Sequence, residues 1–304
     1  MKIGIDVGGS HIASGIVDEN GKLVDKESRD LELAELGSEE RATELILSQI
    51  NYEINVLLKR NGFEIGDISK MGLAVPGNPS ETSIRNLVNL HIDEFDIASA
   101  LKKQYNTKIS LHNDGKSAGM AEKKFGALKL YSDCIFLCIG TGVGSAVFMD
   151  GDLLVPKNAV GFELGHMIID KSSSNKCNCG NNGCFETFAS MKRFKKNAIK
   201  ELKLEKDYLS EEVQNYIRTN IDNVDVQNFL NEYLDNVAVG ISNLINIFEP
   251  EAIAFGGSFS YYADIFLPIL KLKVEKYKFN KETKTALIEA KLKNDAGMIG
   301  AALM

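Results

Sequence analysis

The sequence predicts an α/β protein built from two related lobes, and three observations support this fold class. The chain has 304 residues, and a single domain usually holds about 100–200, so two lobes are expected. Short apolar runs with strand character alternate with longer segments of helical periodicity. A unit of strand, glycine turn, strand and hairpin begins at the N-terminus and recurs about half a chain later, which indicates lobes of similar topology.

The first unit of this repeat occupies the N-terminal residues. An apolar run at 2–7 ends in a glycine turn, and a second run at 12–17 leads into Asn20-Gly21, a strong hairpin signal. A third strand at 22–27 completes the meander. The other elements expected in this half are a helix at 38–59, a strand at 71–75, a helix at 97–105 and a strand at 108–111.

The second unit begins with an apolar strand at 134–139 and repeats the glycine turn and hairpin. Its further elements are strands at 145–149 and 153–155, a mainly helical stretch at 191–248, a strand at 251–255 and a terminal helix at 296–304. A hinge near 112–114 is expected to join the lobes. The predicted domains are a smaller N-terminal α/β lobe at 1–112, joined by the terminal helix at 294–304, and a larger C-terminal α/β lobe at 113–293.

The composition excludes several classes of protein. Hydrophobic residues make up 44% and charged residues 25%, as in ordinary globular proteins. The formal net charge is −7, from 35 basic and 42 acidic residues without a basic stripe, so nucleic acid is not an expected partner. No apolar run of about 18 residues and no signal peptide is present, so we expect a cytoplasmic protein with no membrane partner.

The cysteines indicate a metal site. Five cysteines without a secretion signal argue against a disulfide framework and for a reducing compartment. Three of them and one histidine lie within nineteen residues, in a segment rich in Gly, Ser and Asn. This set suits a closed, structural Zn²⁺ site. The predicted ligands are His166, Cys177, Cys179 and Cys184, whereas Cys134 and Cys138 lie in an apolar strand and are expected in the core.

Three glycine turns follow predicted strands. Glycine lets backbone N–H groups approach phosphate oxygens, and a Ser or Thr hydroxyl adds a donor. One such turn alone would more often be only a turn, but three together indicate nucleotide binding. Neither a Walker motif nor a dinucleotide fingerprint is present, which disfavours P-loop and Rossmann folds. The turns are Asp6-Val7-Gly8-Gly9-Ser10, Gly140-Thr141-Gly142-Val143-Gly144 and Gly256-Gly257-Ser258.

A polar pair, Asn113-Asp114, follows the strand at 108–111. A carboxylate at a strand end can accept a proton from a substrate hydroxyl, so Asp114 is the candidate general base. Two alternatives remain open at this stage. Asp114 could instead cap a helix N-terminus, and His112 could compete as the base.

These three constellations, in this order, resemble the ROK family of repressors, open reading frames and kinases, whose kinases phosphorylate hexoses. The resemblance covers essentially the whole chain and is most specific at 163–166 and 177–186. It implies a two-lobed actin-like ATPase (ribonuclease H-like) fold with the active site in the interlobe cleft. It also implies an ATP-dependent hexose kinase that acts at O6, with glucose as the default substrate.

The resemblance assigns roles to individual residues. It implies Asp114 as the catalytic base, Mg²⁺ near Asp6, ATP as the donor, structural Zn²⁺ and a homodimer. The implied sugar-binding residues are Gly77, Asn78, Asn86, Asn113, Asp114, Glu163, His166 and Glu186. The implied nucleotide-binding residues are Asp6, Gly8, Gly9, Ser10, Thr141, Gly142, Gly256, Gly257 and Ser258.

The sequence departs from the family at two points. His11 stands where the family usually has lysine, which removes a positive charge near the phosphates, and the chain has no Trp for the sugar pocket. N-acetylhexosamine, mannose, fructose, allose or a β-glucoside therefore also fit. A sugar-sensing repressor would need a helix-turn-helix before the first glycine turn, which begins at residue 8. A catalytically silent sugar-binding protein is the third alternative, and the intact Asp114 favours the enzyme.

Overall fold

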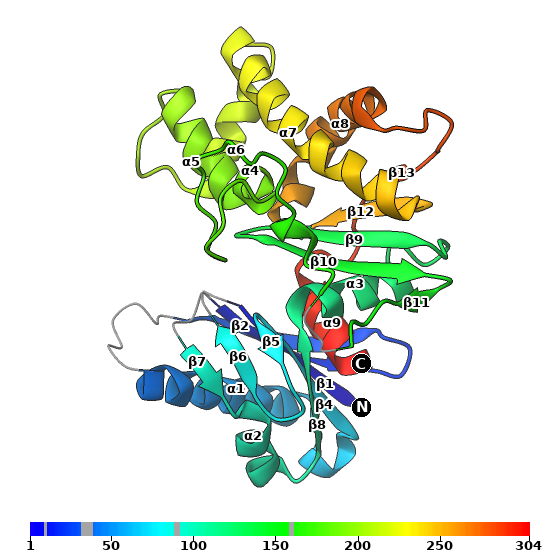
Figure 1. Cartoon of the computed structure of the whole chain (residues 1–304). Helices are drawn as coiled ribbons and strands as arrows, with labels where there is room; N and C mark the ends of the chain where they lie inside the picture. Colours follow the sequence, from blue (N-terminus) through cyan, green and yellow to red (C-terminus); the bar gives the residue numbers. More distant parts are fainter. Residues whose placement is uncertain (9–10, 32–38, 88–91, 158–160) are drawn as a thin grey trace. The chain divides into compact units, whose positions relative to one another are not determined.

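The computed structural model describes residues 1–8, 11–31, 39–87, 92–157 and 161–304 (Figure 1). They form two compact units. The first unit comprises Met1–Lys129, Val155–Gly161 and Leu292–Met304, and the second comprises Leu130–Leu154 and Phe162–Lys291. The division therefore falls at Lys129 and not at the predicted residue 112, because α3 (Asp114–Lys124) packs against α9 (Ala296–Leu303) within the first unit.

The large sheets of the two units have the same topology. The first has the order β3-β2-β1-β4-β8 and the second the order β11-β10-β9-β12-β13. In each, the first strand of the unit is central, with an antiparallel hairpin partner on one side and a parallel strand on the other. This common order confirms the α/β fold class and the predicted repeat. The strands are β1 Lys2–Val7, β2 His11–Val17, β3 Leu23–Asp30, β4 Lys70–Val75, β8 Lys108–Asn113, β9 Cys134–Ile139, β10 Val143–Met149, β11 Asp152–Leu153, β12 Ala252–Gly256 and β13 Ala286–Glu289.

The remaining elements surround these sheets. The first unit also holds α1 (Glu39–Asn61), η1 (Ile65–Asp67), α2 (Ile97–Tyr105), η5 (Lys293–Asp295) and a small sheet of β5 (Asn78–Pro79), β6 (Ile84–Leu87) and β7 (Ile92–Phe95). The second unit holds η3 (Leu164–His166), α4 (Glu186–Ala189), α5 (Met191–Glu201), α6 (Ser210–Thr219), α7 (Val224–Phe248), η4 (Gly257–Tyr262) and α8 (Ala263–Tyr277). In the described part of the chain, no helix combines the length and apolar character needed to cross a membrane.

Helix α1 covers one face of the first sheet (Figure 1). Its fully buried Ile46, Ile50 and Ile54 recur every four residues and pack with Ile3 and Ile5 of β1. Burial of each such side chain stabilises the fold by about 1.5–3 kcal/mol. The periodicity that predicted this helix therefore reflects a real buried stripe.

Helix α9 packs on the opposite face of the same sheet through glycines. Gly4 of β1 pairs in register with Gly72 of β4, and both point away from the α1 side because side chains alternate along a strand. A Cβ atom on Gly4 would lie 1.8 Å from the carbonyl oxygen of Met298, and one on Gly72 would lie 1.8 Å from that of Ala301. The backbone of α9 thus rests directly on the strands.

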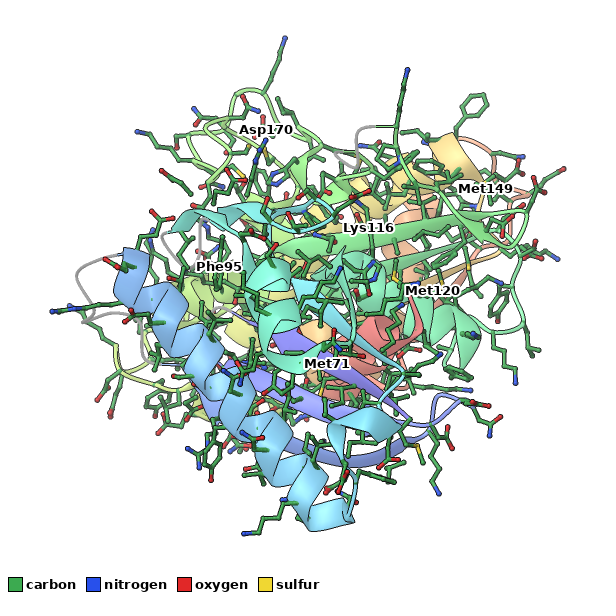
Figure 2. The ribbon with its side chains drawn as sticks, turned by 90° about the horizontal axis from the view of Figure 1, so that it is seen from below. Met71, Phe95, Lys116, Met120, Met149 and Asp170 are labelled. Atoms are coloured by element: carbon green, nitrogen blue, oxygen red, sulfur yellow. The ribbon has the colours of Figure 1, made fainter. Side chains whose placement is uncertain are left out.

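Glycine also joins α9 to its neighbouring helix. A Cβ atom on Gly300 would lie 1.7 Å from the carbonyl oxygen of Ser117 on α3. Met71 of β4, and Lys116 and Met120 of α3, can be followed in Figure 2. The C-terminal helix therefore packs closely against both the sheet and α3.

The core of the second unit is centred on Phe194 of α5. Its ring centroid lies between 4.6 and 5.4 Å from the rings of Phe229, Tyr233, Tyr262 and Phe266. The pairs with Tyr233, Tyr262 and Phe266 are edge-on, and such pairs add about 0.5–1.5 kcal/mol beyond their buried area. They hold α5 and η4 in fixed positions.

The first unit also contains a buried carboxyl group. Glu53 of α1 is fully buried, and its Oε2 accepts a hydrogen bond of 2.7 Å from the Ser14 hydroxyl. Burial raises the pKa of Glu53 to about 7. The ionised form is therefore unfavourable in the folded protein.

We predict that Gly72→Ala destabilises the first unit by about 3 kcal/mol, because the methyl group would overlap the α9 backbone. Urea unfolding measures the change. Gly66→Ala is the matched control, since no heavy atom lies within 4 Å of its added Cβ. A Gly72→Ala protein as stable as the control would contradict the close packing of α9.

We predict that Glu53→Gln stabilises the protein more at pH 8 than at pH 5. The pKa is raised from 4.5 to about 7, so the folded state loses stability as pH rises through this range, by on the order of 3 kcal/mol. The neutral amide of Glu53→Gln does not ionise and so removes that loss. Thermal unfolding of the wild type and the variant at pH 5 and pH 8 measures the effect. A stability difference between the two proteins that is equal at both pH values would contradict the prediction.

Candidate functional site

Two carboxyl groups interact in the first unit. Asp6 is the last residue but one of β1, and Asp114 is the first residue of α3. Burial, and after it the negative charge of Asp114, raises the pKa of Asp6 to about 7. A Cβ atom on Gly297 would lie 2.0 Å from Asp6 Oδ2, so α9 packs onto this carboxyl group. The pair would favour a shared proton or a bound cation.

Asn113, and not Asp114, caps α3. Its Oδ1 accepts a hydrogen bond of 3.1 Å from the Lys116 N–H, and its Nδ2 donates one of 3.4 Å to the Gly77 carbonyl. The capping interpretation of Asp114 is therefore wrong. Asp114 is exposed, and its Oδ1 accepts a hydrogen bond of 2.7 Å from the Gly115 N–H. The structure brings Asn113 and Gly77 together at this strand end.

His112 is a poor alternative base. Burial, and after it the positive charge of Lys70, lowers the pKa of His112 to about 4. Its Nε2 is buried and has no hydrogen-bond partner among the described residues. A group with this pKa takes up a proton weakly at neutral pH.

For the other site residues predicted in the first unit, the structure gives only part of the position. Asn78 lies on β5 and Asn86 on β6, and their side chains are outside the description. Gly8 is described and its N–H donates a hydrogen bond of 2.9 Å to the His11 carbonyl. Gly9 and Ser10 lie outside the described residues.

The four predicted metal ligands come together in the second unit. Their ligand atoms all lie within 4.8 Å of one another, with His166 Nδ1 3.5 Å from Cys177 Sγ and Cys179 Sγ 3.6 Å from Cys184 Sγ. Gly183 has φ +74°, and a Cβ atom there would lie 1.8 Å from the Asp170 carbonyl oxygen. This tight turn delivers Cys184, as the glycine in the motif predicts.

The thiols of this cluster suit a divalent cation. Burial raises the pKa of the Cys184 thiol to about 12 and raises the pKa of Cys177, whereas the backbone N–H of Asn181 lowers the pKa of Cys179. Metal ligation requires thiolates, so a bound cation would supply the compensating charge. Three thiols and one imidazole within this radius fit tetrahedral zinc. Cys134 is fully buried on β9 and belongs to the core, as predicted, whereas Cys138 on the same strand is only half-buried.

Glu186 links the metal cluster to a glycine turn. Its Oε2 accepts a hydrogen bond of 2.9 Å from the Val143 N–H, and its Oε1 lies 3.8 Å from Cys177 Sγ. A Cβ atom on Gly142 would lie 2.4 Å from Glu186 Oε2, so only glycine leaves room for the carboxylate. Glu163 precedes η3, and its carbonyl accepts a hydrogen bond of 3.0 Å from the His166 N–H. The turn, the carboxylate and the cluster are thus one local structure.

The second unit also contains a cavity of about 550 Å³. Two glycine turns, two helices and η4 line it. The lining residues are Gly140, Thr141 and Ser258 from the turns, Met191, Lys192, Phe194 and Lys195 from α5, Ser210, Glu211, Val213 and Gln214 from α6, and Tyr261 and Tyr262 from η4. This volume and the mixture of aromatic and polar groups are typical of a small-molecule site.

The predicted nucleotide residues divide into two groups here. Thr141 and Ser258 line the cavity. Gly142, Gly256 and Gly257 instead allow close packing behind it, since a Cβ atom on Gly256 would lie 2.8 Å from the Phe136 ring and one on Gly257 2.7 Å from the Ile139 carbonyl oxygen.

Sequence reasoning missed the cavity residues from α5 and α6, and Tyr261 and Tyr262 of η4. The run of basic residues at 192–196 was a usable signal for the α5 wall. The sequence carries no such signal for Gln214 and Tyr261, because neither lies in a recognisable motif.

The paired sheets define an actin-like ATPase fold. A solved structure of a ROK family glucokinase from Streptomyces griseus, in complex with glucose and AMPPNP, superposes with a TM-score of 0.83 at 21% identity over 99% of this chain and 97% of that one. The ROK family profile matches residues 2–304. The chain belongs to the ROK family.

Curated relatives of the chain include glucokinases and xylose repressors. It is 28% identical to the glucokinase of Thermotoga maritima over 326 residues, which cover 99% of this chain and 95% of the relative. It is 29% identical to the xylose repressor of Bacillus subtilis over 258 residues, which cover 84% of this chain and 64% of the repressor. The chain thus spans less than two thirds of that repressor's length.

We predict that protein purified without chelator contains about one zinc per chain, the content of a closed four-ligand site. Cys184→Ser should lose most of the metal and lower the melting temperature, because Cys184 is a buried ligand atom of the cluster. Cys138→Ser, on β9 outside the cluster, is the control. Elemental analysis measures the zinc content of each protein. A wild-type protein that contains no metal and keeps its melting temperature would contradict the metal site.

Proposed function

We propose that this chain is an ATP-dependent hexose kinase that transfers the γ-phosphate of MgATP to a sugar hydroxyl at O6. Asp114 carries this proposal. It is an exposed carboxylate at the start of α3, is not used as the helix cap and is electrostatically coupled to Asp6. A binding protein has no need of such a base, whereas a kinase uses one to receive the hydroxyl proton.

The cavity of the second unit is the proposed donor site. Tyr261, whose side chain is exposed, and the partly accessible edges of Tyr262 and Met191 offer apolar surface to a nucleotide base. Thr141 and Ser258 offer hydroxyl groups at two turns, where backbone N–H groups can hold phosphate oxygens. Lys192 and Lys195 add positive charge on the same lining, which suits a phosphate-bearing ligand.

The proposed sugar ligands are the residues that the family resemblance implies. His166 turns Nδ1 toward Cys177, which leaves Nε2 for a sugar hydroxyl. Glu186 is oriented by the Val143 N–H. The other proposed sugar ligands are Gly77, Asn78, Asn86, Asn113, Asp114 and Glu163. Zinc held by the four-residue cluster would stabilise the segment that carries His166, and glucose is the default substrate.

In the proposed step, Asp114 accepts the proton of the sugar hydroxyl as that oxygen attacks the γ-phosphorus. The products are the sugar phosphate, ADP and a proton that Asp114 later releases to water. Asp6 would hold Mg²⁺, which neutralises charge on the phosphates, since carboxylate oxygens are its usual protein ligands. Phosphoryl transfer depends mainly on positioning and electrostatic stabilisation.

A sugar-responsive transcriptional regulator is the second candidate. The 29% identity to the xylose repressor of Bacillus subtilis favours it. A regulator would bind a sugar without consuming ATP, so measurement of phosphate transfer separates the two functions.

We predict that Asp114→Asn lowers the turnover number by about 10²–10⁴-fold while sugar affinity changes much less, because the amide can bind a hydroxyl but cannot take its proton. A coupled assay of ADP release and calorimetric titration with the sugar measure both quantities. Asp93→Asn, an exposed aspartate on β7, is the matched control.

Each of three results would contradict one part of the proposal. Near-normal turnover of Asp114→Asn would place the base elsewhere. Loss of sugar affinity in proportion to turnover would make Asp114 a sugar ligand only. Sugar binding without phosphate transfer by the wild-type chain would favour the regulator.

A further inference from the structure

One side of the cavity is formed by Gln214 of α6, whose amide orientation is fixed. Its Nε2 donates a hydrogen bond of 2.7 Å to the Tyr261 carbonyl. Arg218, four residues later on the same helix, donates a second bond of 2.7 Å to that carbonyl from Nη2. A carbonyl oxygen has two lone pairs, and these two donors occupy both.

Arg218 is itself held in place. Its Nη1 donates to Asp264 Oδ2 at 2.7 Å, and its Nη2 donates to Asp264 Oδ1 at 2.8 Å. Two-pronged pairs of this kind are geometrically specific. The Asp264–Arg218 pair therefore fixes the Tyr261 carbonyl, and this carbonyl fixes the amide of Gln214.

A half-turn of the Gln214 amide would direct Oε1 at the Tyr261 carbonyl oxygen. Two acceptors would then face each other, at the cost of an unsatisfied hydrogen bond. The amide consequently presents one defined pattern to a ligand, the acceptor Oε1 beside the second hydrogen of Nε2. Within the described residues no donor reaches Oε1.

This pattern complements adenine and not a 6-oxopurine. Adenine carries an amino donor at C6 beside an acceptor ring nitrogen, and glutamine pairs with such an edge through both amide atoms. In hypoxanthine and guanine the C6 substituent is an oxygen acceptor and N1 carries a hydrogen, so donor and acceptor exchange places. A freely rotating amide could follow this exchange, but a fixed one cannot.

We propose that Gln214 selects adenine over 6-oxopurine bases in the phosphoryl donor, with Arg218 as the positioning residue. The inference rests on the proposed function, in which this cavity holds the donor. Tyr261 and Tyr262 on the same lining offer aromatic surface to either kind of purine, so discrimination between the bases depends on their polar edge.

Calorimetric titration of the whole protein with MgATP and MgITP tests the inference, since the two nucleotides differ only at C6 and N1 of the base. The wild type should bind ATP about 10–100-fold more tightly than ITP, the discrimination expected of one two-pronged contact. Gln214→Met, similar in length but without the amide, should weaken ATP binding and bring the ratio close to one. Gln227→Met, exposed on α7 and outside the cavity lining, should leave the ratio unchanged.

Arg218→Met should lower the ATP to ITP ratio while sugar affinity stays constant, because the loss acts through the amide orientation. A wild type that binds both nucleotides equally would overturn the inference. So would a Gln214→Met protein with native melting temperature and an unchanged ratio.

The phosphate-transfer assay separates this inference from the proposed function. Equal turnover with ATP and ITP would contradict only the selectivity of Gln214. An ATP preference that Gln214→Met abolishes, without transfer to any hexose, would support the inference and contradict the kinase. Failure to bind either nucleotide would contradict both.

Discussion

The first unit depends on the contact between the backbone of α9 and bare glycine positions of the sheet. Gly4 and Gly72 leave the strand surface flat, and the carbonyl oxygens of Met298 and Ala301 occupy the space that side chains would fill. The same helix places Gly297 against Asp6 and Gly300 against the α3 backbone. The position of α3, and with it the position of Asp114, is therefore set by a segment near the C-terminus that returns to the N-terminal strands.

Short-range patterns predicted much of this structure. The strand at 134–139 and the helix at 97–105 have the bounds that their apolar patterns indicated. The strand is almost wholly buried, and the helix is bounded by its caps Asp96 and Asn106. The cluster of three cysteines and one histidine was also predictable, since its members are close in sequence and glycine marks its turn. The small sheet of β5, β6 and β7 was not, because strands of two to four residues carry no measurable periodicity. The cavity residues Gln214 and Tyr261 meet only through tertiary packing.

Glu186 shows how a structural site can position groups for chemistry. Its carboxylate accepts a hydrogen bond from the Val143 N–H and lies beside Cys177. A movement of the cysteine cluster would therefore be transmitted to the glycine turn that contains Gly142. In the proposed enzyme a zinc ion bound by this cluster would have a structural role. It would supply rigidity to the segment from His166 to Glu186, which polar, glycine-rich residues could not supply by hydrophobic packing alone.

Kinase activity is the central claim, and ³¹P NMR of the wild-type protein with MgATP and a panel of single hexoses tests it most directly. With at least one hexose, the γ-phosphate resonance of ATP should disappear while a sugar phosphomonoester resonance and those of ADP grow in equal amounts. An unchanged ATP spectrum with every sugar, in protein that still binds one of them, would contradict the kinase and favour a sugar-sensing role.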